Sequence, residues 1–118
     1  MTNDTQKTSQ KWFGVKTLYQ CQGKNITPNM NCYEERITVW QADSFDEAIE
    51  KAVQEAQEYA KEAGTYLGFC QAFEMYTEPK EGAEVYSIMR EDDRTSEVYI
   101  DTMYDTGREY SLKETTQA

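Results

Sequence analysis

The chain has 118 residues, with 22 acidic and 12 basic side chains, no histidine and a formal net charge of -10. Hydrophobic residues make up 38% and aromatic residues 13%, so the chain can form a core and is not an acidic disordered tail. The lack of histidine excludes Ser-His-Asp triads, Cys-His pairs, histidine-ligated zinc and imidazole pH switches. The negative charge argues against nucleic acid as the main partner, because phosphate binding needs a basic surface.

Both ends of the chain are polar. Residues 1–10 lack the apolar segment of a secretory signal, and no apolar run approaches the roughly 18 residues that a membrane span needs. We expect residues 1–10 and 113–118 to be disordered tails on either side of a single α+β domain over residues 11–112. We therefore expect a cytoplasmic protein that does not contact a membrane.

Two strands are predicted in the first third of the chain. Residues 11–21 and 32–41 both alternate and are rich in β-formers. In the first, Phe13, Val15, Thr17, Tyr19 and Cys21 share one side. Residues 22–31 between the strands contain glycine, proline and several asparagines, which predicts the long loop of an antiparallel hairpin.

A helix is predicted from the capping box Ser44-Phe45-Asp46-Glu47, in which side-chain oxygens satisfy free backbone N–H groups. Gly64 is well placed to end this helix. Small apolar residues recur at helical spacing and form one thin stripe, which lets the helix lie close to a sheet. The stripe consists of Ala48, Ile49, Ala52, Val53, Ala56, Tyr59, Ala60 and Ala63.

The remaining elements are predicted to be mainly strands. Residues 65–77 carry apolar side chains on both faces, which is typical of a central strand, and residues 83–90 follow a turn at 78–82 and pair with it. Residues 96–104 alternate as a further strand, with a short helix over 97–104 as the alternative. Asp105-Thr106-Gly107 predicts a tight loop leading into 108–112. The order β-β-α-β-β, plus a C-terminal hairpin or short helix, predicts an α+β fold whose antiparallel sheet carries one long helix on one face.

Two carboxylates lie on apolar strand faces. Glu35 alternates with Tyr33 and two aliphatic residues, so we expect it to be drawn toward the core, with Arg36, Arg90 or Lys16 as its cation. Glu74 lies within the otherwise apolar third strand. Each carboxylate has two interpretations: an acid–base group with a shifted pKa, or, as the favoured one, a structural ion pair.

An acidic cluster between residues 91 and 105 includes Asp101 and Asp105. Its spacing does not match a calcium-binding loop, so a solvated acidic surface is favoured, and we expect no metal site and no cofactor. Aromatic residues are more numerous than one thin core can bury, which indicates a protein-binding or oligomer interface, with ordinary packing as the alternative. They include Trp12, Trp40, Tyr66, Tyr76, Tyr86, Tyr99 and Tyr104.

The three cysteines contain no C-x-x-C pair. Cys21 and Cys32 bracket the loop of the predicted hairpin and can face each other, so a disulfide between them is compatible with the spacing. In a reducing compartment the favoured interpretation of these residues, and of Cys70, is that of small buried hydrophobes.

Several short segments, taken in order, resemble a bacterial family of small stand-alone proteins known as domain of unknown function 4288. The resemblance covers residues 11–109 and implies a bacterial cytosolic protein of about this size, with no activity and no catalytic residues. The segments are Trp12-Phe13-Gly14-Val15, Tyr33-Glu34-Glu35-Arg36-Ile37, Ser44 through Ala60, Tyr66-Leu67-Gly68-Phe69, Gln71-Ala72-Phe73-Glu74, Gly82-Ala83-Glu84-Val85, Met89-Arg90 and Asp105-Thr106-Gly107.

Two functions are compatible with these observations. The first is a non-enzymatic domain of the immunity or inhibitor type that binds a basic protein through an aromatic sheet face or an acidic surface; homo-oligomerisation is compatible with either function. The charge distribution supports the first function. Residues 1–40 hold five basic and three acidic side chains, whereas residues 41–63 and residues 91–109 each hold two basic and seven acidic side chains. The alternative is a small-molecule-binding or catalytic pocket. The candidate binding residues are Trp12, Tyr33, Glu35, Arg36, Trp40, Glu74, Arg90, Asp101 and Asp105, and Glu35, Glu74, Arg36 and Arg90 would form the pocket.

Overall fold

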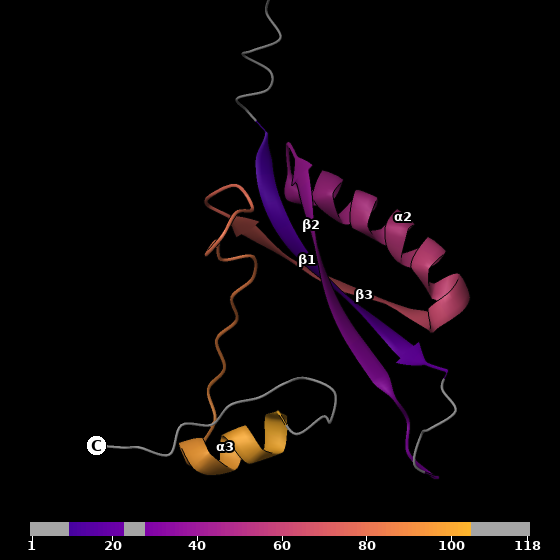
Figure 1. Cartoon of the computed structure of the whole chain (residues 1–118), viewed down its shortest axis with the longest axis vertical. Coiled ribbons are helices and arrows are strands. Elements are labelled where there is room, and N and C mark those ends of the chain that lie inside the picture. The colour runs from indigo at the N-terminus through magenta and orange to yellow at the C-terminus, as the bar shows by residue number, and fades with distance from the viewer. Residues whose placement is uncertain (1–9, 23–27, 105–118) are drawn as a thin grey trace, which may run out of the picture. The chain divides into compact units, whose positions relative to one another are not determined.

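The structure is a computed structural model that describes residues 10–22 and 28–104. In chain order its elements are β1 (Lys11–Cys21), β2 (Tyr33–Ala42), α2 (Phe45–Ala63), β3 (Gly64–Met75) and α3 (Ser96–Met103), as Figure 1 shows. The predicted α+β class is confirmed, but the order is β-β-α-β-α. The chain divides after Ser87 into two compact units, and α3 belongs to the second.

The three strands form an antiparallel sheet in the order β2-β1-β3, so β1 is central. The prediction that β3 is central is therefore wrong. Phe13 of β1 lies opposite Trp40 and Glu74. The β1–β3 register shifts beside Leu18, and Gly68 lies in this bulge with a φ of 79°.

Helix α2 begins and ends at the predicted residues. The Ser44 hydroxyl accepts a hydrogen bond from the backbone N–H of Glu47 at 3.1 Å, and the Glu47 carboxylate accepts one from the N–H of Asp43 at 2.7 Å. At the other end the N–H of Gly64 bonds to the carbonyl of Ala60, and Gly64 has a φ of 148°. A Cβ on Gly64 would lie 2.2 Å from the Gln20 carbonyl oxygen, so glycine is needed where the helix turns into β3.

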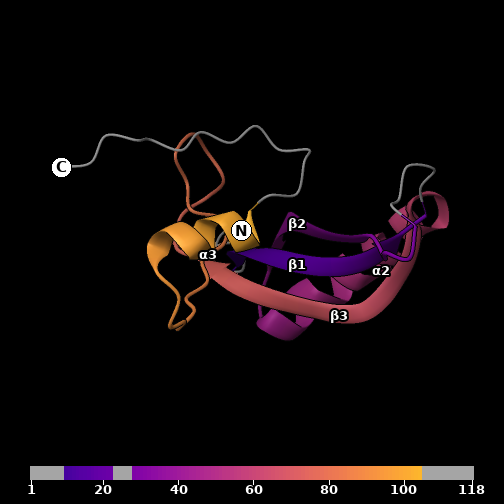
Figure 2. The same cartoon turned by 90° about the horizontal axis from the view of Figure 1, so that it is seen from below.

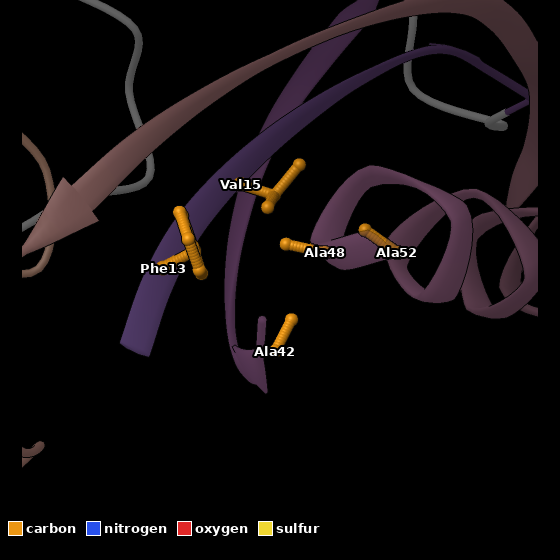
Figure 3. Close-up of a cluster of buried hydrophobic side chains, with 5 residues drawn as sticks. All are labelled: Phe13, Val15, Ala42, Ala48 and Ala52. Atoms are coloured by element: carbon orange, nitrogen blue, oxygen red, sulfur yellow. The ribbon is translucent and has the colours of Figure 1, made fainter. Parts of the chain in front are cut away.

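The core lies between one face of the sheet and the alanine stripe of α2. Figure 2 shows the sheet and the helix turned by 90° from Figure 1. Phe13, Val15, Thr17 and Tyr19 of β1 are all buried on this face, as the alternation of β1 predicted. Figure 3 shows Phe13 and Val15 gathered with Ala42, Ala48 and Ala52 between sheet and helix. Small alanine side chains let the two layers approach closely, which is why a helix of modest hydrophobicity can cover the sheet.

The predicted fourth strand over residues 83–90 does not form. Its first half, residues 83–87, which we call the strap, instead lies on the sheet face opposite α2. There the backbone of Val85 passes so close to Gly14 that an added Cβ would lie 1.8 Å from the Val85 carbonyl oxygen. The Tyr86 hydroxyl donates a hydrogen bond to Gln71 at 2.8 Å, and its ring packs 5.9 Å from that of Phe73. Packing of Tyr86 on this face thus replaces strand pairing at the sheet edge.

The strand predicted over residues 96–104 is wrong, and the alternative of a short helix is confirmed. Helix α3 begins after Thr95, whose hydroxyl accepts a hydrogen bond from the N–H of Val98 at 3.3 Å. None of its residues is buried, so the apparent alternation does not correspond to a buried and an exposed strand face. The rings of Tyr99 and Tyr104 pack 6.1 Å apart within this unit.

Several predictions lie outside the described residues. They concern the tails over 1–9 and 113–118, the middle of the 22–31 loop, the tight loop at 105–107 and the segment 108–112. Within the described ranges, no helix is both long and apolar enough to cross a membrane.

Candidate functional site

The two faces of β2 are exchanged relative to the prediction. Glu34, Arg36, Thr38 and Trp40 are half-buried on the side of α2, whereas the residues between them are exposed. The prediction that Glu35 is drawn into the core is therefore wrong: its side chain is 60% exposed and pairs with Lys16 at 3.3 Å. The physical reason is that α2 offers polar partners to β2, so the polar face of the strand is the one that packs.

Arg36 is the centre of a polar network between β2, β1 and α2. Its guanidinium makes two 2.7 Å hydrogen bonds to the two carboxylate oxygens of Glu55. It also donates to the Tyr19 hydroxyl at 3.3 Å, and its Cζ lies 3.8 Å from the centre of the Tyr59 ring. The Tyr59 hydroxyl in turn donates to both oxygens of Glu34 at 2.9 Å. The network ties the middle of β2 to the helix.

The protonation states of this network are firmly held at neutral pH. The hydrogen bonds from Arg36 lower the pKa of Glu55, and Glu55 raises the pKa of Arg36. The hydrogen bond to Glu34 raises the pKa of Tyr59. Each shift favours the charge state that the group already has near pH 7. The network is thus suited to holding geometry rather than to exchanging protons.

Because the folded-state pKa of Glu55 is lowered, its contribution to stability is present above its unfolded pKa of about 4.3 and is lost as the pH falls through the folded value. We expect Glu55→Gln to lower the free energy of unfolding by about 1 kcal/mol at pH 7 and by much less at pH 3. Urea unfolding of both proteins at the two pH values measures this difference. A loss that is equal at both pH values would contradict it.

Three of the four residues of the alternative pocket, Glu35, Arg36 and Glu74, do not come together. Glu35 and Arg36 point to opposite faces of β2. Glu74 pairs with Lys11 at 3.4 Å and lies opposite Phe13, four residues along β1 from the partner of Arg36, which corresponds to about 13 Å. Arg90 belongs to the second unit, where it donates to the Tyr99 hydroxyl at 3.3 Å. Glu35, Arg36 and Glu74 therefore do not form one site.

The other described candidate residues lie on different elements. Trp40 is half-buried, packs against the core and donates from Nε1 to the Thr38 hydroxyl at 2.7 Å. Trp12 is half-buried on the face opposite α2 and lies across from Gln41 and Met75. Asp101 is exposed on α3, and Asp105 lies outside the described residues.

The described part of the acidic cluster includes an internal ion pair. The Arg94 guanidinium and backbone N–H bond to Asp92 and lower the pKa of that carboxyl to about 2. Among the residues that the structure describes, no group of three or more cysteine, aspartate or glutamate side chains is placed to hold a metal ion.

The outer edge of β2 presents backbone groups that no described strand pairs with. Cys21 and Cys32 lie directly opposite each other and are hydrogen-bonded. In an antiparallel pair every second residue bonds to the neighbouring strand, and the residues between them direct their N–H and C=O groups to the other side. On β2 these outward residues include Tyr33, Glu35, Ile37 and Val39. The next carbonyl of this row, that of Gln41, accepts a hydrogen bond from Lys51 at 2.7 Å. The side chains of Tyr33, Ile37 and Val39 are 59%, 43% and 37% exposed. The free edge and an exposed apolar row thus belong to the same residues.

One side of helix α2 borders this edge. Lys51, Glu55 and Tyr59 on this side of the helix bond to Gln41, Arg36 and Glu34 of β2. One turn further on, a shallow hollow opens on the same side. It is lined by Glu55, Glu58, Tyr59, Glu62 and Ala63. We use the name β2 surface for the free outer edge of β2, its exposed row Tyr33, Ile37 and Val39, and the acidic border of this edge. The acidic border consists of Glu55, Glu58 and Glu62 of α2.

Sequence reasoning identified two members of the β2 surface, Tyr33 and Glu35, but not the surface itself. The available signal was the row Tyr33, Ile37 and Val39, which is as apolar as the buried row of β1. Alternation alone could not tell whether this row faced the helix or solvent.

Comparison with known families adds one finding. A family model described as "Domain of unknown function (DUF4288)" matches residues 12–87. The chain belongs to the DUF4288 family. The match spans almost the whole three-stranded sheet, α2 and the strap, and it ends at Ser87, where the first compact unit also ends. The part of the predicted resemblance beyond Ser87 lies outside the matched DUF4288 region. No curated protein and no solved structure matches the chain.

Proposed function

We propose that this DUF4288 protein is a small, acidic, non-enzymatic interaction domain that binds a basic protein by taking an extended segment of it as an additional strand on β2. Masking a basic partner in this way is the action of an immunity or inhibitor protein. The observation that carries the proposal is the β2 surface, where outward backbone groups and exposed apolar side chains come from the same residues.

Strand geometry specifies the segment that fits. Alternate side chains of an added strand point to opposite faces of the sheet. One set would lie beside Tyr33, Ile37 and Val39, and the other would point toward the side of the sheet that carries Glu55, Glu58 and Glu62. A segment that alternates apolar residues with lysine or arginine therefore complements both sides of the edge.

Charge supports a basic rather than an acidic partner. The chain carries a net charge of -10, and α2 has six acidic and two basic residues. A field of this sign steers a basic partner toward the surface. Natural edge strands are often protected by lysine or proline, whereas none of the five residues of β2 whose backbone groups point outward is basic or proline.

The test is a titration of the isotope-labelled full chain with a short synthetic peptide that alternates valine and lysine, followed by NMR. We expect the largest amide shifts at Tyr33, Glu35, Ile37 and Val39, because their N–H groups gain acceptors. Binding should weaken as salt is added. A peptide that alternates valine and glutamate is the charge control, and we expect it not to bind.

Ile37→Pro removes one outward N–H group without touching the ladder to β1, and proline is tolerated at such edge positions. We expect about tenfold weaker peptide binding than for the matched variant Ile37→Ala. Ile37→Lys, which keeps the N–H group but repels the lysine peptide, is a second variant if the proline variant does not fold. Equal binding by the proline and alanine variants would contradict the proposal. A dimer of the chain that is lost in Ile37→Pro would assign the edge to a second copy and overturn the basic partner.

A further inference from the structure

Cys21 and Cys32 face each other at the end of the β1–β2 hairpin. The register pairs Gln20 with Tyr33, so the next pair along is Cys21 with Cys32. The backbone N–H of Cys21 donates to the carbonyl of Cys32 at 2.8 Å. Directly opposite residues that are hydrogen-bonded in this way have Cα atoms about 5.5 Å apart, which lies within the range that disulfides span.

The two side chains also lie on the same face of the sheet. Both thiols are free and half-buried, in contrast to the prediction of buried cysteines. A hydrogen bond to Cys32 is the main cause that raises the pKa of Cys21 to about 11.

We propose that Cys21 and Cys32 are a redox-sensitive dithiol that closes to an intramolecular disulfide when a low-molecular-weight disulfide, such as oxidised glutathione, is the oxidant. This inference is independent of the proposed interaction function, because it uses neither the outer edge of β2 nor the acidic border.

The reaction is a thiol–disulfide exchange in two steps. Cys32, after losing its proton to solvent, attacks one sulfur of the oxidant, so that a mixed disulfide forms and one small thiolate leaves. Cys21 then loses its proton and attacks the Cys32 sulfur, which expels the second small thiolate. The two protein thiols lose two electrons in total, and the oxidant is reduced to two thiols. The same disulfide and the same two small thiols form if Cys21 attacks first and Cys32 second.

The third cysteine is an internal control. Cys70 lies opposite Thr17, four residues along β1 from Cys21, or about 13 Å, which is beyond the reach of a disulfide. A bond between Cys21 and Cys32 closes a ring of twelve residues. Such a ring restricts the unfolded chain, so we expect oxidation to raise the Tm by about 5–10 °C.

The experiment is incubation of the full chain with oxidised glutathione, followed by thiol counting, peptide mapping and thermal unfolding. We expect two of the three thiols to be lost, a Cys21–Cys32 peptide, a free Cys70 and a higher Tm that reverts on reduction. Cys21→Ser should accumulate glutathione on Cys32, because the second step is removed. Cys70→Ser, the matched control, should close as the wild type does.

Three outcomes would overturn the proposal. They are glutathione retained on the separate cysteines of the wild type, a disulfide between two chains, and three thiols that stay reduced at every ratio of oxidised to reduced glutathione. None of these outcomes bears on peptide binding at the β2 surface, so this proposal and the interaction function can fail separately.

Discussion

Alanine at position 14 is expected to release the strap from the sheet and to lower the free energy of unfolding by about 2 kcal/mol. The added Cβ would lie 1.8 Å from the carbonyl oxygen and 3.0 Å from the carbonyl carbon of Val85. Both are backbone atoms, so no rotation of a side chain relieves the clash. The strap must move, and Tyr86 then loses its hydrogen bond to Gln71 and its packing on Phe73.

The direction of this effect is opposite to that of an ordinary strand position, where alanine is favoured over glycine by about 0.5–1 kcal/mol. Urea unfolding gives the stability, and limited proteolysis or hydrogen exchange over residues 83–87 reports the release of the strap. Tyr86→Ala removes the main side-chain contact without the clash. If Gly14→Ala already releases the strap, the double variant should be little less stable than Gly14→Ala alone.

Gly68→Ala is a steric control for the same substitution. A Cβ at Gly68 would meet no atom within 4 Å, although its φ of 79° makes any side chain strained. We expect a cost from backbone strain of about 1–2 kcal/mol, with no change in protection of residues 83–87. A Gly14→Ala variant that is as stable as the wild type and equally protected would show that the strap does not hold this position.

Replacing Arg36 with methionine is expected to lower the free energy of unfolding by about 2–3 kcal/mol. Methionine keeps most of the apolar stem but leaves the half-buried Glu55 carboxylate without its two hydrogen bonds. The Tyr19 hydroxyl loses a donor, and the ring of Tyr59 loses the cation above it. The loss should exceed that of Glu55→Gln, because the glutamine amide can still bond to Arg36.

A double-mutant cycle isolates the ion pair from the rest of the network. We expect Arg36→Met with Glu55→Gln to be more stable than the sum of the single losses implies, by about 1 kcal/mol, because the double variant no longer holds an unpaired carboxylate. Arg36→Lys keeps the charge but not the two parallel hydrogen bonds, so an intermediate loss is expected. Additive losses in the cycle would contradict a direct coupling between Arg36 and Glu55.

Local sequence signals located the first half of the fold well. The alternation of β1 correctly predicted which of its faces is buried. This strand is central, so the same face of β1 and of both neighbouring strands lies toward α2. The capping box at Ser44 and the glycine at position 64 gave both ends of α2, because backbone groups at helix ends need nearby partners wherever the helix lies. These features depend on residues a few positions apart.

The later elements could not be predicted in the same way. Residues 83–90 were predicted to be a strand, but nothing local tells whether such a segment pairs at a sheet edge or lies across a face. Here Gly14, about seventy residues earlier in the chain, leaves room for Val85 and decides the outcome. Residues 96–104 alternate like a strand, but α3 buries none of them, and the cap at Thr95 is sufficient to start a helix.

The ion pairs of the candidate site also could not be predicted from local sequence. Arg36, Arg90 and Lys16 were the candidate cations for Glu35, but Arg36 is its neighbour on the strand, and adjacent residues of a strand point to opposite faces. The partner of Arg36 is Glu55 on α2, which only the packing of the helix brings within reach. The choice of Lys16 for Glu35 follows from the β1–β2 register, in which Lys16 lies opposite Ile37.

The composition by itself determined that this is an acidic chain without histidine chemistry, and the local patterns determined its first hairpin and its long helix. The tertiary structure alone decided which face of β2 is covered. Helix α2 brings Glu55 and Tyr59 over the polar row of that strand, where paired charges and hydrogen bonds compensate for burial. The apolar row Tyr33, Ile37 and Val39 is therefore left beside a free edge, and that choice of face is what creates the β2 surface.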